Sequence, residues 1–302
     1  MSKKEEDFVA NIQDNRTISS RFIISNKEIR IAKSGKKYVE FLLSDKTGDI
    51  IGRYFSNADD ESIHDSIILG KVYQISGNAN EFPKNSGRFS IIINQINSTF
   101  ENEYDIKDFL KVSNKNKDEL ILKITKTITH IKNIHLKNLL QSFFDDEIFI
   151  KKFSISPAAM FHHHNYQGGL LEHTVEVLEI CKKISVIFPE LNKDLLYSGA
   201  ILHDIGKIET YESDSCSIFY SEKGKMLDHL FISADMVKNK MNTIEISEDL
   251  INELLHLILS HHGDVQNGWG SAVSPQTPEA ITLHHADNLD AKVKETLQNG
   301  KI

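Results

Sequence analysis

The chain has 302 residues, about two ordinary domains, with 40% hydrophobic and 26% charged residues. This composition is typical of a globular protein and excludes dominant disorder, collagen-like repeats and low complexity. The formal net charge of −8 argues against a wholly basic nucleic-acid coat. The 2 cysteines form no close pair in the sequence, so we expect reduced thiols in a cytoplasmic protein. The polar start and the lack of any apolar run near about 18 residues predict no signal peptide and no membrane contact.

Charge and histidine are distributed unevenly along the chain. Residues 16–100 carry 12 Lys and Arg against 9 Asp and Glu, whereas residues 101–302 carry 21 against 30. Of the 14 histidines, only His64 precedes residue 130. We interpret this as two modules with different tasks, and the second as a candidate for metal or acid–base chemistry, because imidazole serves both at neutral pH.

Five short β-strands are predicted in residues 16–100, where β-branched and apolar runs alternate with turn residues. We expect them over 21–31, 37–43, 49–55, 71–79 and 88–96, with a loop or short helix over 58–68. This pattern fits the OB-fold, a small five-stranded β-barrel that commonly binds single-stranded nucleic acid. The predicted fold is therefore multidomain: the barrel at 16–100, a helical connector at 101–156 and an all-α domain at 157–302.

A strand-binding barrel would offer cations to phosphates and aromatic rings to unstacked bases. The candidates that we single out for substrate binding are Lys36, Tyr38 and Arg53. The ordinary alternative is that barrel aromatics fill the core and cations are solvated, because alternate residues of each strand must be buried.

Histidine and aspartate recur in five short strings of the second module, all in helical contexts. The strings are GGLLEHT with His173, LHDIGK with His203 and Asp204, LDHL with His229, SHHG with His261 and His262, and HHADNLDAK with Asp287. A metal site would need ligands that converge from several helices. Because adjacent helical residues diverge by about 100°, we expect His203 on one ion and Asp204 bridging toward a second. Nitrogen and carboxylate donors without thiolates favour Mn²⁺, Fe, Co²⁺, Ni²⁺ or Zn²⁺.

These strings resemble those of the HD-domain metal-dependent phosphohydrolases. With TPEA and the preceding barrel, the chain is similar to the YhaM family of bacterial 3′-to-5′ exoribonucleases over nearly all of residues 16–295. The resemblance implies an N-terminal OB-fold, a C-terminal HD domain, and one or two divalent ions, Mn²⁺ foremost. It implies metal ligands at His173, His203, Asp204 and Asp287, with His229 and His261 on a second ion and His262 as the alternative to His261. It also implies that Lys207 meets a phosphate oxygen and that His163 and His164 lie near the substrate.

The expected function is hydrolysis of single-stranded RNA, with single-stranded DNA as a further candidate, to nucleoside 5′-monophosphates. A metal-activated hydroxide would attack the terminal phosphodiester, with Asp204 and Lys207 as catalytic residues. Two alternatives remain: an HD phosphohydrolase of a small nucleotide, and a single-strand-binding protein with a vestigial HD domain. A small nucleotide needs no strand-holding module, and a vestigial site would not keep every ligand type. A homo-oligomer is compatible with the chain, but nothing in the residues sets its symmetry.

Overall fold

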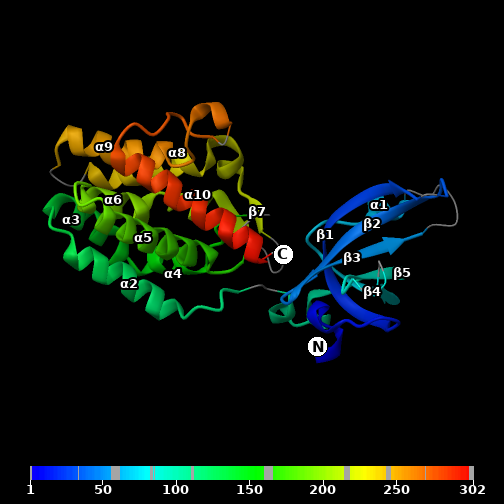
Figure 1. The fold of residues 1–302 in the computed structure, drawn as a ribbon. Helices are drawn as coiled ribbons and strands as arrows, with labels where there is room; N and C mark the ends of the chain where they lie inside the picture. The colour runs from blue at the N-terminus through cyan, green and yellow to red at the C-terminus, as the bar shows by residue number, and fades with distance from the viewer. Residues whose placement is uncertain are drawn as a thin grey trace. The chain divides into compact units, whose positions relative to one another are not determined.

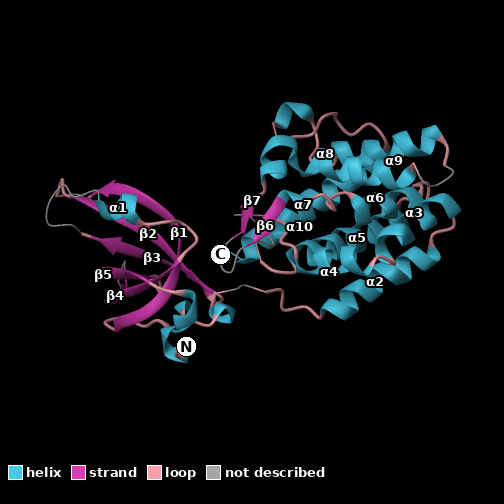
Figure 2. Cartoon of the chain, turned by 180° about the vertical axis from the view of Figure 1, so that it is seen from behind, coloured by secondary structure: helices cyan, strands magenta, loops and turns pink. Residues whose placement is uncertain are grey.

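The computed structural model describes residues 2–32, 34–55, 62–81, 84, 86–109, 112–159, 166–213, 218–242, 246–268 and 270–298. The chain divides into two compact units: the first comprises Met1–Lys111 and Ser213–Ser217, and the second comprises Val112–Glu212 and Ile218–Ile302. Strands form the first unit, and the second consists mostly of helices (Figures 1 and 2). Each unit has a hydrophobic core of its own, so each is described by itself.

The first unit is a closed barrel in which neighbouring strands follow the order β1-β2-β3-β5-β4. Its strands are β1 (Thr17–Ile31), β2 (Lys37–Asp45), β3 (Gly48–Tyr54), β4 (Val72–Glu81) and β5 (Phe89–Ser98), with helix α1 (Ser62–Ser66) between β3 and β4. The strands β3 and β5 pair in parallel and the other neighbours are antiparallel. The predicted five-stranded barrel is confirmed.

The barrel closes because β1 is long enough to pair on two sides. The first half of its 15 residues pairs with β4 and the second half with β2. Inward side chains such as Phe22 and Phe41 are fully buried, as alternation along a strand requires. At Gly77 a Cβ atom would lie 2.2 Å from the Ile92 carbonyl oxygen, so only glycine lets β4 and β5 approach this closely.

Short 3₁₀ turns flank the barrel in the sequence. They are η1 (Glu5–Asp7), η2 (Val9–Asn11), η3 (Glu101–Glu103) and η4 (Ile106–Asp108). Between and after the first two turns, Phe8 and Ile12 are buried. The segment before β1 is therefore part of the folded first unit.

The second unit is a helical bundle with one small sheet. Its elements are α2 (Lys117–His130), α3 (Ile134–Phe144), α4 (Glu147–Ile155), α5 (Gly169–Ile187), α6 (Lys193–Leu202), α7 (Lys207–Thr210), β6 (Tyr211–Ser213), β7 (Ile218–Tyr220), α8 (Glu222–Met241), α9 (Glu248–Ser260), η5 (Val265–Asn267) and α10 (Pro278–Gln298). Buried residues from α2 to α10 belong to one hydrophobic cluster. The helices of the predicted connector therefore share their core with the helices that carry the histidines.

Local sequence signals explain where several of these helices begin. An Asn, Asp or Ser side chain accepts hydrogen bonds from the first-turn N–H groups of six helices, and these caps are Asn116, Asn133, Asp146, Asn192, Ser221 and Ser247. The first turns of α5 are buried nearly all round, so this helix lies inside the bundle. A polar side chain in the first turns of α5 is therefore buried and shielded from water.

A helix must be long and apolar to cross the hydrocarbon core of a lipid bilayer. Among the described residues, none of the helices has both the length and the apolar character needed to cross a membrane.

Candidate metal centre

Three segments that are distant in the sequence bring a first group of four donors together in the second unit. His173 lies in the first turns of α5, His203 and Asp204 directly follow α6, and Asp287 lies on α10. The His173 Nε2 atom is 3.1 Å from the Asp287 Oδ1 atom, 3.3 Å from the His203 Nε2 atom and 3.4 Å from the Asp204 Oδ2 atom. Donors about 2.1 Å from a shared ion lie about 3.0–3.4 Å apart, so this spacing fits one metal ion.

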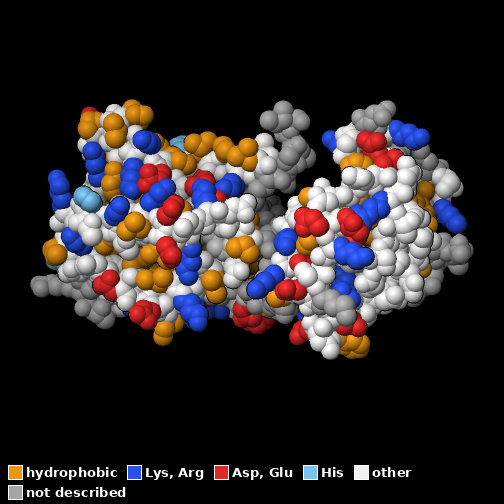
Figure 3. Space-filling model, turned by 90° about the horizontal axis from the view of Figure 1, so that it is seen from below, with side chains coloured by type: hydrophobic (Ala, Val, Ile, Leu, Met, Phe, Trp, Pro, Cys, Tyr) orange, Lys and Arg blue, Asp and Glu red, His pale blue; other side chains and the backbone are white. Residues whose placement is uncertain are grey.

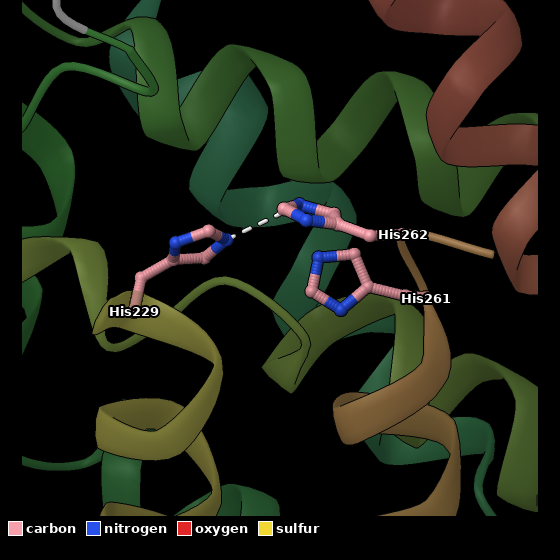
Figure 4. Close-up of side chains that lie close together, drawn as sticks. All are labelled: His229, His261 and His262. Atoms are coloured by element: carbon pink, nitrogen blue, oxygen red, sulfur yellow. Dashed lines mark hydrogen bonds between the residues drawn. The ribbon is translucent and has the colours of Figure 1, made fainter. Parts of the chain in front are cut away.

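A second group of donors lies beside the first and consists of three imidazoles. His229 comes from α8, and His261 and His262 follow the end of α9; the three rings lie close together in Figure 4. The Nε2 atoms of His229 and His262 are 3.3 Å apart. The Asp204 Oδ1 atom lies 3.5 Å from the His229 Nε2 atom and 3.6 Å from the His261 Nε2 atom. Asp204 therefore turns one oxygen to each group, in the arrangement of a carboxylate that bridges two ions.

The Nδ1 atoms of His173, His203 and His261 are engaged in hydrogen bonds, so that Nε2 faces the centre. His203 donates from Nδ1 to the Ala200 carbonyl at 2.9 Å, and His261 donates to the Ile258 carbonyl at 2.7 Å. His173 donates from Nδ1 to the Asp290 carboxylate at 2.7 Å. Such partners orient a metal-ligating histidine and set its tautomer.

Unsatisfied buried atoms test whether a cation fits here. Within the described part of the chain, the Asp204 Oδ1 and His261 Nε2 atoms are buried and have no hydrogen-bond partner. A buried polar atom without a partner is costly, and a metal ion between these two atoms would satisfy both. The donors are imidazole nitrogens and carboxylate oxygens, which suit Mn²⁺, Fe, Co²⁺, Ni²⁺ or Zn²⁺. The residues therefore fit one or two such ions.

The pKa values of these carboxylates and of the imidazoles in the second group are shifted in the directions that favour metal binding. Burial alone would raise the pKa values of Asp204 and Asp287. The cationic Lys207 and nearby imidazoles nevertheless hold the pKa of Asp204 well below its usual range, and His173 lowers the pKa of Asp287. Burial lowers the pKa of His229 and of His261, and it lowers that of His262 to about 4. The second group thus holds neutral imidazoles beside ionised carboxylates, which is the protonation state that binds a metal.

His173 and Lys207 are the cationic groups beside these carboxylates. Burial opposes a charge on His173, but its contacts with Asp204, Asp287 and Asp290 raise its pKa well above the usual value. Lys207 is 7% exposed, and its Nζ atom lies 2.5 Å from the Asp204 Oδ2 atom. A cation bound in the first group would replace the proton on His173, since metal binding releases protons from its ligands.

The structure brings together eight of the residues singled out from the sequence. They are His173, His203, Asp204, Lys207, His229, His261, His262 and Asp287. His163 and His164 lie outside the described residues.

The three barrel candidates have different surroundings in the first unit. Lys36 is exposed just before β2, and Tyr38 stacks on Phe55 with ring centroids 5.0 Å apart. Arg53 is engaged within the barrel, because it pairs with Glu40 at 3.2 Å and its guanidinium donates to Ser90. Lys36 and Tyr38 are therefore the more available of the three.

Two carboxylates at the centre were missed by the sequence analysis. Asp290 follows Asp287 by three positions in the string HHADNLDAK, and that helical spacing could have placed both on one face of α10. Asp228 accepts a hydrogen bond from the His229 Nδ1 atom at 2.7 Å. Its role depends on a local backbone conformation that no spacing rule predicts.

Comparison with family models assigns both units. Residues 23–98 match the OB-fold nucleic acid binding domain, and residues 170–292 match the HD domain. The second match contains every donor of both groups. HD domains bind divalent metals, and this one points to a metal-dependent hydrolase or phosphohydrolase. The chain is thus a multidomain protein in which an OB-fold barrel precedes a helical HD domain.

Proposed function

We propose that this protein is a metal-dependent 3′-to-5′ exoribonuclease that hydrolyses single-stranded RNA to nucleoside 5′-monophosphates. The observation that carries the proposal is Asp204, whose two oxygens face two donor groups inside an HD domain that follows an OB-fold. Metal chemistry on a phosphodiester and a module for single strands then occur in one chain. The choice of RNA and the 3′-to-5′ direction rest on the resemblance of the sequence strings.

The residues at the centre have separable tasks in this reaction. Two divalent ions, when bound by these ligands, supply an acidified water and neutralise charge on the phosphate. Asp204 would fix the separation of the two donor groups, because one of its oxygens faces each of them. Asp290 holds the orientation of the His173 ring by accepting a hydrogen bond from Nδ1. Lys207 keeps a positive charge beside Asp204, where it would offset negative charge that develops on the phosphate.

The barrel would hold the upstream part of the strand. Lys36 offers an exposed cation to a phosphate, and the stacked pair of Tyr38 and Phe55 offers an aromatic platform to a base. On the face drawn in Figure 3, Lys and Arg side chains are interspersed with Asp and Glu side chains over both units. This mixed surface favours local contacts with a strand over a general electrostatic coat.

A nuclease assay tests the proposal directly. Purified protein would be incubated with 5′-labelled single-stranded RNA, and separately with DNA, in Mn²⁺ or in EDTA. We expect a Mn²⁺-dependent ladder that shortens from the 3′ end, and faster digestion of RNA than of DNA. Intact strands despite bound metal would overturn the nuclease and favour hydrolysis of a small nucleotide. Intact but gel-shifted strands on a metal-free protein would instead favour a binding protein.

A further inference from the structure

Asp228 has a backbone conformation that residues with a side chain rarely adopt. Its φ of 59° and ψ of 157° interrupt α8, which consists of two helical segments on either side. This region of φ and ψ is almost restricted to glycine, because Cβ crowds the backbone. Among the described residues, Asn15 is the one other non-glycine residue with a positive φ. Strain of this kind persists where the surroundings hold it, and it is concentrated at functional sites.

The carboxylate of Asp228 has two partners immediately after the break. Its Oδ1 atom accepts a hydrogen bond from the His229 Nδ1 atom at 2.7 Å and another from the Leu230 backbone N–H at 3.1 Å. The second bond caps the helical segment that follows. The first bond leaves the His229 Nε2 atom facing the second donor group, 3.3 Å from the His262 Nε2 atom (Figure 4).

The strain explains how two neighbouring residues can meet in this way. Adjacent residues of a regular helix point about 100° apart, so a helical Asp228 would direct its carboxylate away from the His229 ring. His203 and His261 follow the ends of helices and donate to a carbonyl three positions earlier. His229 instead follows the break in α8, and the positive φ of Asp228 brings a carboxylate beside its ring.

We infer that Asp228 is a positioning residue for the second metal ion: its carboxylate holds His229 with Nε2 toward the ion, and the strained backbone is what places that carboxylate. The inference rests on the proposed two-ion function, because it assigns His229 as a ligand of the second ion. It predicts that affinity for the second ion depends on the Asp228 oxygen that accepts from His229. The thermal stability of the metal-free protein should instead depend on the strained φ of residue 228.

Three substitutions separate these two effects. Asp228→Asn retains an acceptor oxygen, and we expect second-ion affinity within about 3-fold of the wild type. Asp228→Ala and Asp228→Gly both remove the acceptor, and each should weaken the second ion by about 10- to 100-fold. Glycine also relieves the strain, so in EDTA the Gly variant should melt about 2–5 °C above the Ala variant.

The measurements are Mn²⁺ titration calorimetry of the metal-free protein, electron paramagnetic resonance and thermal melting. With two equivalents of Mn²⁺, the wild type and Asp228→Asn should give the spectrum of two coupled ions, and the Ala and Gly variants that of one isolated ion. Asn15→Gly is the matched control, because it places glycine at the other non-glycine residue with a positive φ among the described residues, just before β1. It should leave both Mn²⁺ affinities unchanged.

The possible results distinguish failure of the positioning role of Asp228 from failure of the proposed two-ion function. If the wild type binds two ions and the Gly variant binds the second ion more tightly than the Ala variant, affinity follows backbone strain and the positioning role is overturned. If all three variants bind both ions as the wild type does, the role is likewise overturned. A wild type that binds a single ion overturns the two-ion function itself, and the inference with it.

Discussion

Two aspartates, one in each unit, are almost completely buried, yet their surroundings differ in kind. Asp45 in the barrel accepts from the Lys3 Nζ atom at 2.6 Å and the Val9 N–H at 2.9 Å through Oδ2. Its Oδ1 atom accepts from the backbone N–H and the hydroxyl of Thr47 at 2.9 and 2.5 Å. Donors thus surround both oxygens of Asp45. Asp204 in the helical unit has the Lys207 ammonium on Oδ2, and its Oδ1 atom has no hydrogen-bond donor among the described residues.

The other close neighbours of Asp204 are imidazole Nε2 atoms. The Nε2 atoms of His229 and His261, whose pKa values burial lowers, lie 3.5 and 3.6 Å from the Asp204 Oδ1 atom. A neutral imidazole whose Nδ1 carries the proton presents a lone pair at Nε2 and accepts rather than donates. A buried carboxylate among donors stabilises a fold, whereas one that faces acceptors needs a cation between them. This difference separates a structural aspartate from a metal-binding one.

The largest effect is expected when the metal-facing aspartate is changed. Asp204→Asn should reduce turnover at least about 1,000-fold, which is about 4 kcal/mol of barrier, because a neutral amide cannot bridge two cations. RNA affinity should stay within about 3-fold, since the strand is held mainly by the barrel. Turnover is measured on labelled RNA and affinity by fluorescence anisotropy in EDTA. Cleavage at the wild-type rate would rule out the mechanism.

The barrel aspartate should behave in the opposite way. Asp45→Asn leaves the buried Lys3 ammonium, 3.8 Å from the centre of the Phe22 ring, without its counter-charge. Breaking a buried ion pair in this way should lower the free energy of unfolding of the barrel by about 3 kcal/mol. Urea denaturation followed by circular dichroism measures the loss. Mn²⁺ content and turnover of the folded fraction should match the wild type, and a loss of bound Mn²⁺ would contradict the comparison.

Periodicity and spacing were sufficient for the outline of both units but not for their supporting contacts. The barrel strands could be predicted because alternation and turn residues are local signals, although β1 begins four residues before the predicted Arg21. The metal-facing residues could be named because they occur in recurring strings. The ion pair of Lys3 with Asp45 could not be predicted, since the two residues are 42 positions apart in the sequence. Spacing likewise gives no reason to link His284 to His261, yet the His284 Nδ1 atom donates to the His261 carbonyl at 2.8 Å.

A smaller effect is expected from the carboxylate that supports His173. Asp290→Ala removes the acceptor for the His173 Nδ1 atom and frees the ring to rotate. Loss of such a partner should weaken Mn²⁺ binding about 10- to 100-fold, or about 1.4–2.7 kcal/mol. Calorimetric titration with Mn²⁺ measures the change. His285→Ala, at an exposed position on the same helix, is the control and should bind Mn²⁺ as the wild type does.

The smallest effect is expected on the barrel surface, where an exposed cation should contribute more to RNA binding than a cation that is already ion-paired. Lys36 is exposed, whereas Arg53 already pairs with Glu40 and donates to Ser90. Lys36→Ala should therefore weaken RNA binding about 2- to 5-fold and lower the slope of log affinity against log salt by about one, as the loss of one phosphate contact does. Arg53→Ala should leave that slope unchanged, because an ion-paired guanidinium releases few counterions when a phosphate arrives. Affinities in EDTA over a range of KCl concentrations provide both slopes. If Arg53→Ala lowers the slope as much as Lys36→Ala does, internal pairing does not decide which cations of the barrel contact the strand.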